Sequence, residues 1–211
     1  MISTRDAVPP VAEVHAAPNS ANESSQRDLR SQDFRLRAQQ LALREQIERN
    51  HFLLERLSAS STRLLQSLDS STVFEAIAEI IANLVGSEQV AIFYYAPERE
   101  SFQSAWSCGV EPSSLERVAA SNGMLRRTAR KATTQFREIQ DAASFLPGEI
   151  NLTACIALKS GQDVIGAIAI FDLLPQKQRL EWADFELFKF LEVYAAYAIE
   201  IQRLREKRGA S

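Results

Sequence analysis

Apolar residues recur at heptad spacing over one long stretch of the chain. One of the two seam positions holds Leu36, Leu43, Asn50, Leu57 and Leu64, and the complementary position holds Gln40, Ile47, Leu54, Ser61 and Leu68. This is the pattern of a coiled coil, in which polar seam residues such as Asn50 fix the register. Residues 31–70 are therefore predicted to form a long helix that pairs with a second copy, and a single amphipathic helix lying on its own domain is the open alternative.

The segments that flank this helix divide the chain further. Residues 1–30 are rich in Ala, Pro, Ser and Asn and have no apolar periodicity, which is typical of a disordered tail. Residues 71–205 have the composition of one globular domain, and residues 206–211 form a charged C-terminal tail. The N-terminus lacks the apolar core of a signal peptide, so a cytoplasmic protein without membrane insertion is expected.

Charge and residue counts exclude several function classes. The formal net charge of −3 gives no global reason to expect nucleic acid. Both histidines, His15 and His51, precede the globular region, which therefore has no imidazole for general-base catalysis or metal binding. Cys108 and Cys155 lack metal-type spacing and are predicted to be packed thiols. We expect no catalytic residue, no metal site and no cofactor.

The globular region predicts an α+β fold with an antiparallel sheet. A helix over 72–86 ends at Gly86, a typical C-cap residue. Two short helices, over 112–120 and 124–132, lie in the long central connection, and a last helix spans 182–207. Strand-like segments cover 89–95, 102–108, 134–139, 152–158 and 164–171.

This order of elements resembles that of a GAF domain, a module of many bacterial signalling proteins. The resemblance covers residues 60–205, and it is carried by "LLQSLDSSTVFEAIAEIIANLVGSEQVAIFYY", "SAWSCGV" and "LKSGQDVIGAIAIFDLLPQKQRLEWADFELFKFLEVYAAYAIEIQRL". It implies a twisted antiparallel sheet with flanking helices on one face and a ligand pocket under the central insertion on the other.

The sequence departs from three ligand-binding or enzymatic branches of that family. Cyclic-nucleotide-binding members carry an Asn-Lys pair and an Asp-Glu pair, where this chain has Asp172-Leu173 and Asp184-Phe185. Chromophore-binding members use a Cys in the insertion, and residues 109–154 contain none. One branch reduces free methionine sulfoxide with several cysteines, so a reductase that uses Cys108 and Cys155 is kept as an alternative.

Candidate ligand-contacting residues come from the strands and from the second insertion helix. Small residues on one face of the last two strands either permit close helix packing or leave a cavity, and we expect the cavity. The pocket candidates are Trp106, Cys108, Leu125, Ala129, Phe136, Cys155, Ala157, Ala167 and Ala169. Arg126 and Arg130 are candidates for binding an anion, and a solvated helix face is the alternative.

The last helix is apolar on nearly every side, so one sheet cannot cover it and a second copy is predicted to do so. The predicted homodimer interface comprises Leu43, Ile47, Asn50, Leu54, Leu57, Leu64, Leu187, Leu191, Tyr194, Ala198 and Ile201. The sequence thus indicates a non-catalytic, dimeric GAF domain protein that senses a small ligand or acts as an adapter for an unidentified signalling partner. A degenerate GAF scaffold that mediates only protein–protein interaction is a further alternative.

Overall fold

The computed structural model describes residues 20–67, 73–137 and 151–209. The described part of the chain begins with helix α1 (Ser20–Ser67), and the chain divides into two units, 1–49 and 50–211, so that the last part of α1 belongs to the second unit. The helix starts at Ser20, ahead of the predicted start at residue 31, so the prediction of a disordered tail is corrected for residues 20–30. Residues 1–19 of the predicted tail and seam residue Leu68 lie outside the described residues.

The second unit contains one antiparallel sheet of five strands in the order β2-β1-β5-β4-β3. The strands are β1 (Val90–Ala96), β2 (Ser101–Cys108), β3 (Gln135–Phe136), β4 (Ala154–Ser160) and β5 (Asp163–Ile170). Four of them lie within two residues of their predicted ranges. The predicted α+β fold with an antiparallel sheet is confirmed.

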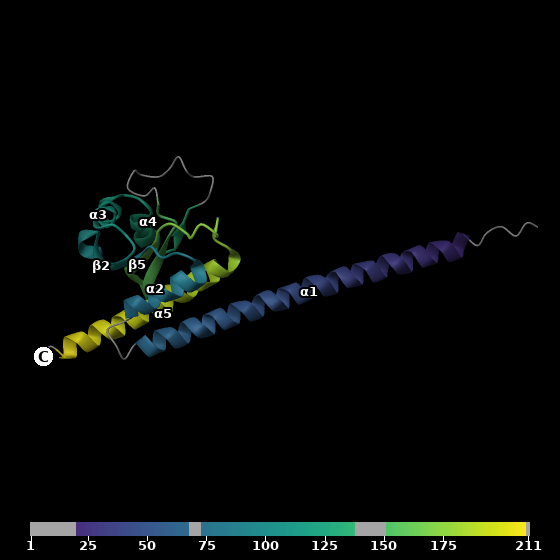
Figure 1. Cartoon of the computed structure of the whole chain (residues 1–211), viewed down its shortest axis with the longest axis horizontal. Helices are drawn as coiled ribbons and strands as arrows, with labels where there is room; N and C mark the ends of the chain where they lie inside the picture. Colours follow the sequence, from purple (N-terminus) through teal and green to yellow (C-terminus); the bar gives the residue numbers. More distant parts are fainter. Residues whose placement is uncertain (1–19, 68–72, 138–150, 210–211) are drawn as a thin grey trace, which may run out of the picture. The chain divides into compact units, whose positions relative to one another are not determined.

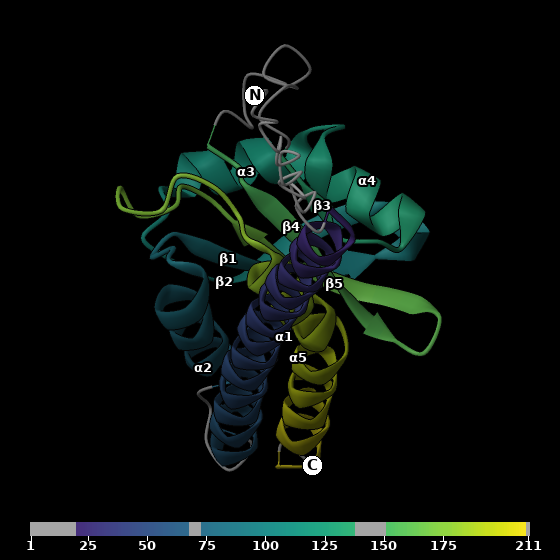
Figure 2. The same ribbon diagram turned by 90° about the vertical axis from the view of Figure 1, so that its right-hand side faces the viewer.

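Helices cover both faces of this sheet (Figure 1). The two helix layers are seen most clearly in Figure 2. On one face lie α2 (Val73–Ile80), its π-helical extension η1 (Ile81–Val85) and α5 (Trp182–Gly209), and on the other lie α3 (Pro112–Ala120) and α4 (Met124–Lys131). A short turn, η2 (Pro97–Arg99), joins β1 to β2. Gly86 ends η1 in the left-handed region with a φ of 80°, as its predicted C-cap role requires.

Alternating strand residues divide the core into two clusters. Val90 and Ile92 of β1 point to the α5-face cluster, which also contains Ile156, Ile168 and residues of α2 and α5. Ala91 and Phe93 point to the α4-face cluster, formed by Ala91, Phe93, Phe102, Leu115, Val118, Met124, Leu125, Leu152, Cys155, Ala167, Ala169 and Phe171. Gly166 lies next to a bulge in β5, and a side chain is excluded there because a Cβ would come within 2.3 Å of the Phe93 carbonyl oxygen.

The last part of α1 packs on its own domain. Leu64 is buried in the α5-face cluster and Leu57 packs against it, whereas Leu54 remains 65% exposed. Residues 53–67 therefore form an amphipathic helix that lies on its own domain, which was the alternative to a coiled coil. Pairing with a second copy stays a prediction for the exposed seam residues Leu43, Ile47 and Asn50. No described helix is both long enough and apolar enough to cross a membrane.

Candidate functional site

Six of the nine predicted pocket residues lie together on the α4 face of the sheet. Leu125 and Ala129 come from α4, and Cys155, Ala157, Ala167 and Ala169 come from β4 and β5. The strand register pairs Cys155 with Ala169 and Ala157 with Ala167, so these four form two neighbouring rows that point to the same side. The sequence alternation correctly placed small residues there.

Large side chains occupy the space between these small residues and the helices. Phe93, Met124, Leu125 and Leu152 are each at most 1% exposed. The Thr128 hydroxyl of α4 donates to the Met124 carbonyl at 3.0 Å and lies 3.5 Å from the Cys155 carbonyl oxygen. For the described residues, the outcome is therefore close packing of α4 on the strands in place of the expected cavity.

The other three pocket candidates, Trp106, Cys108 and Phe136, are corrected because they lie on the opposite face of the sheet. Trp106 pairs with Ile92, and Cys108 pairs with Val90. Residues paired across strands point to the same side, and both partners belong to the α5-face cluster.

Phe136 pairs with Ala154 of that same cluster. Its ring lies 4.9 Å from the ring of Phe185 on α5, measured between centroids. These three residues therefore cannot line a site beneath α4.

The two candidate anion-binding arginines both belong to α4 but differ in burial. Arg130 is exposed and forms an ion pair with Glu100 at 3.2 Å, and both side chains are about 60% exposed. Arg126 is half-buried, and its Nε is buried without a hydrogen-bond partner. The alternative of a solvated helix face therefore describes Arg130 but not Arg126, and anion binding stays a prediction.

The two thiols lie far apart in the sheet. The row that starts at Cys108 continues through Val90 and Ile170 to Ala154, the neighbour of Cys155. Three inter-strand spacings of about 4.8 Å separate the ends of this row by roughly 14 Å. A disulfide requires Cα atoms within about 7 Å, so Cys108 and Cys155 cannot form a redox pair in this fold. Cys108 is exposed, and Cys155 is buried.

An apolar groove follows the outer side of α5 where the last part of α1 lies beside it. It has a volume of about 180 Å³ and is lined by Ser61, Leu64, Leu65, Phe190, Tyr194, Tyr197, Ala198 and Ile201. We call it the α1–α5 groove. Tyr194 and Tyr197 are 56% and 48% exposed, and the rings of Phe190 and Tyr194 stack with centroids 4.5 Å apart. Exposed aromatic rings on a helix are typical of a surface that another protein covers.

The predicted dimer residues divide between this exposed surface and the protomer's own core. Leu54, Tyr194 and Ile201 are exposed, and Leu57 is half-buried. Two predicted contacts, Leu187 and Leu191, are corrected, because they are fully buried in the α5-face cluster. Leu64 and Ala198 also pack in this cluster at 4% exposed, but they border the α1–α5 groove.

A buried ionic cluster lies where α5 begins. Asp184 is fully buried, and its carboxylate accepts hydrogen bonds from Lys177 Nζ and from the Glu181 backbone N–H, both at 2.7 Å to Oδ2. Arg56 Nη2 of α1 lies 3.4 Å from Asp184 Oδ1 and donates to the Leu84 carbonyl oxygen. We call Arg56, Lys177 and Asp184 the Asp184 cluster.

Sequence reasoning singled out Asp184 but missed Arg56 and Lys177. The sequence signal for Arg56 is its position next to seam residue Leu57, which packs against the core.

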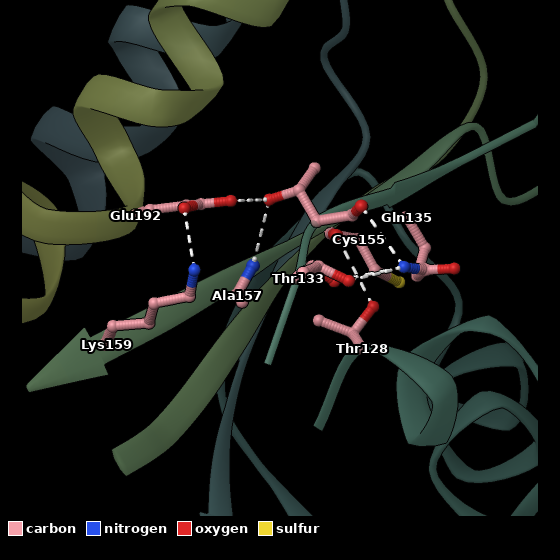
Figure 3. A network of polar contacts seen from close by, with 8 residues as sticks. Thr128, Thr133, Gln135, Cys155, Ala157, Lys159 and Glu192 are labelled. Carbon is pink, nitrogen blue, oxygen red and sulfur yellow. Dashed lines mark hydrogen bonds and ion pairs between the residues drawn. The ribbon is translucent and has the colours of Figure 1, made fainter. Parts of the chain in front are cut away.

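A second polar network fastens α5 to the sheet edge (Figure 3). Glu192 of α5 accepts a hydrogen bond from the Thr134 hydroxyl and pairs with Lys159 Nζ at 3.0 Å. The Thr134 oxygen in turn accepts the Ala157 N–H at 3.3 Å. Among the described residues, no three His, Cys, Asp or Glu side chains are grouped as ligands for a metal ion.

The fold has close counterparts among solved structures, although no protein-family model and no curated protein matches the sequence. A GAF domain of a phosphoenolpyruvate-protein phosphotransferase from Coxiella burnetii aligns with a TM-score of 0.55 and 11% identity, over 72% of this chain and 98% of that one. A GAF domain from Pseudomonas syringae pv. tomato, described as part of a sensor histidine kinase, aligns with a TM-score of 0.53 and 15% identity, over 79% of this chain and 97% of that one.

A GAF domain/HD domain protein from Geobacter sulfurreducens aligns with a TM-score of 0.50 and 17% identity, over 70% of this chain and 98% of that one. The chain therefore has the GAF fold that its sequence resembles.

Proposed function

We propose that this chain is a non-catalytic GAF-fold domain that works as a homodimeric adapter in a bacterial signalling assembly. The proposal combines the fold, whose similar structures come from bacterial signalling proteins, with the exposed apolar surface of the helix layer.

The observation that carries the proposal is the α1–α5 groove. Tyr194, Tyr197 and Ile201 project from one side of α5 while the opposite side of the same helix fills the core. Full burial of a large apolar side chain contributes about 1.5 to 3 kcal/mol, and these three residues, which are 37–56% exposed, would each contribute about half of that before the entropy of association is subtracted. A second copy is the occupant we propose, because α1 carries exposed apolar residues at coiled-coil seam positions, among them Leu43, Ile47 and Leu54.

Two features support the non-catalytic part of the proposal. The register keeps the two thiols out of disulfide reach, which removes the resolving step that a two-cysteine reductase needs. The sequence has no histidine after His51, so the domain also lacks the usual base for activating a nucleophile.

An adapter role is favoured over sensing of a small ligand because large side chains fill the α4 face. Sensing is tested by a thermal-shift screen with nucleotides, amino acids and organic acids. A compound that binds the native state raises the melting temperature by mass action. Such a compound, losing its effect in Ala169→Leu, would favour the sensor.

The adapter proposal is tested by measuring molar mass with light scattering during gel filtration. Tyr194→Glu places a charge in the α1–α5 groove and is expected to convert a wild-type dimer into a folded monomer. Trp182→Glu is the matched control, because Trp182 is another exposed aromatic on α5, 50% exposed, outside the groove. A variant Tyr194→Glu that keeps the mass of the wild type would contradict the proposal.

A further inference from the structure

Arg56 is a charged side chain that α1 inserts into the domain. It is 8% exposed, although arginine is rarely buried without a partner. Its Nη2 donates to the Leu84 carbonyl oxygen and lies 3.4 Å from Asp184 Oδ1. One guanidinium therefore joins α1 to the end of η1 and to the start of α5.

The two acceptors of Arg56 come from different parts of the domain, the end of η1 and the start of α5. The Leu84 carbonyl lies in the last turn of η1, where a helix has carbonyls without an internal partner. The Asp184 carboxylate is also held by Lys177, which lies in the connection between β5 and α5. Three segments that are distant in the sequence thus depend on the position of one α1 residue.

The serine side chains of this α1 surface contribute little to the choice of register. The hydroxyls of Ser60 and Ser61 donate to the carbonyls of Arg56 and Leu57 on their own helix, at 2.9 and 2.8 Å. Small side chains bonded to their own backbone leave a smooth surface, along which a shifted helix would keep similar contacts. A shift by one heptad would bring Leu64 to the position of Leu57 and Arg63 to that of Arg56, so Arg56 selects against detachment and against shifts other than a whole heptad.

We propose that the Asp184 cluster is a register latch, in which Arg56 fixes where α1 lies along η1 and α5. Opening the latch lets the 53–67 segment of α1 shift or detach while the sheet stays folded. A buried ion pair stabilises a fold little compared with apolar packing but selects one arrangement over others, because misplacement leaves a buried charge without a partner. The latch acts within one chain, so it stands whether or not the chain dimerises as proposed.

Distances between two spin labels test the position of α1 directly. Labels at Thr62→Cys on α1 and Gln103→Cys on β2, both exposed sites, are placed in the Cys108→Ser background. The labelled protein is diluted into excess unlabelled protein, so that pulsed electron paramagnetic resonance reports distances within one chain. We expect one narrow distance distribution with Arg56 and a broadened or second distribution in Arg56→Met.

Arg63→Met is the matched control for this measurement. Arg63 lies one heptad after Arg56 on the same helix and pairs with Glu79 at a half-exposed site, where ion pairs contribute little. This variant is expected to keep the narrow distribution. A wild-type distribution in Arg56→Met would overturn the latch.

Hydrogen exchange separates a latch from a purely structural role. In Arg56→Met, amides of residues 57–67 are expected to exchange about tenfold faster, while amides of β1 and β5 keep their rates. If Arg56→Met does not fold, the same measurement is made on Arg56→Lys. Lysine keeps the charge but loses the planar fork of the guanidinium, so a smaller increase in exchange rate, confined to α1, is expected. Equal acceleration in α1 and in the sheet, or no acceleration, would overturn the proposal.

Discussion

The helix layers on the two faces of the sheet differ in how much apolar surface they leave exposed. On the α4 face, short helices close over small strand residues, and Met124 and Leu125 are at most 1% exposed. On the α5 face, one long helix buries Leu187 and Leu191 against the sheet but exposes Tyr194 and Tyr197 on its other side. The first layer completes its core within the chain, whereas the second leaves apolar surface for another molecule.

This difference locates the proposed function on the helices rather than beneath the insertion. A family resemblance alone directs attention to the α4 face, where ligands are expected. The described residues of that face pack as a core, and the surface that still lacks a cover is on α5 and α1. The following variants test each side of the comparison.

The largest effect is expected from Leu191→Ala on the inner side of α5. Leu191 is fully buried, so its truncation should lower the free energy of unfolding by about 2 to 5 kcal/mol. Urea denaturation followed by circular dichroism measures this change. Leu204→Ala, on the same helix and 59% exposed, should change it by less than about 0.5 kcal/mol when both are measured in the monomeric Tyr194→Glu background. Similar losses for both leucines would contradict the two-sided description of α5.

A smaller loss is expected from Ala169→Leu on the α4 face. The added side chain must displace close-packed neighbours such as Cys155 and should lower the free energy of unfolding by about 1 to 3 kcal/mol. Ala105→Leu, at the half-exposed bulge of edge strand β2, is the control and should have little effect. If Ala169→Leu leaves the stability unchanged or raises it, the α4 face contains a cavity and sensing regains support.

Substitutions of the two cysteines should differ by about 1 kcal/mol in their effect on the free energy of unfolding. Cys155→Ala removes a fully buried sulfur and is expected to lower the free energy of unfolding by about 1 kcal/mol, while Cys108→Ser should be neutral. In the folded wild type, a thiol reagent should modify Cys108 quickly and Cys155 only after unfolding. Rapid modification of both thiols would show that the α4 face opens to solvent.

The smallest effect is expected from Arg130→Gln. Its ion pair with Glu100 is exposed, so the free energy of unfolding should change by less than about 0.5 kcal/mol. Inorganic phosphate should leave the melting temperatures of the wild type and of the variant equally unaffected. Stabilisation of the wild type alone would restore Arg130 as part of an anion site.

The sequence predicts the elements of this fold well because their signals are local. Strand alternation and helix periodicity locate four of the five strands and the last helix within two residues, although they miss the start of α1 by eleven residues. Gly86 identifies a helix end by its positive φ. The same alternation correctly places Ala167, Ala169 and Cys155 on one face.

Features that depend on contacts between distant segments could not be derived in this way. A bulge leaves Ala105 without a partner in β1, and pairing with Ile92 then fixes the side to which Trp106 points. Arg56 and Asp184 are separated by 128 positions, and no local pattern joins them. Periodicity gave the apolar stripes of α5 but not which stripe faces the sheet, so Leu187 and Leu191 were assigned to the wrong surface.

Hydroxyl-radical footprinting at low and high protein concentration tests most directly which surface a second copy covers. Oxidation of Tyr194 and Tyr197 is followed by mass spectrometry, with Trp182 as the exposed reference on the same helix. If a second copy covers the α1–α5 groove, raising the concentration to tens of micromolar should protect both tyrosines and leave Trp182 unchanged. Equal oxidation of all three residues at every concentration would contradict the account.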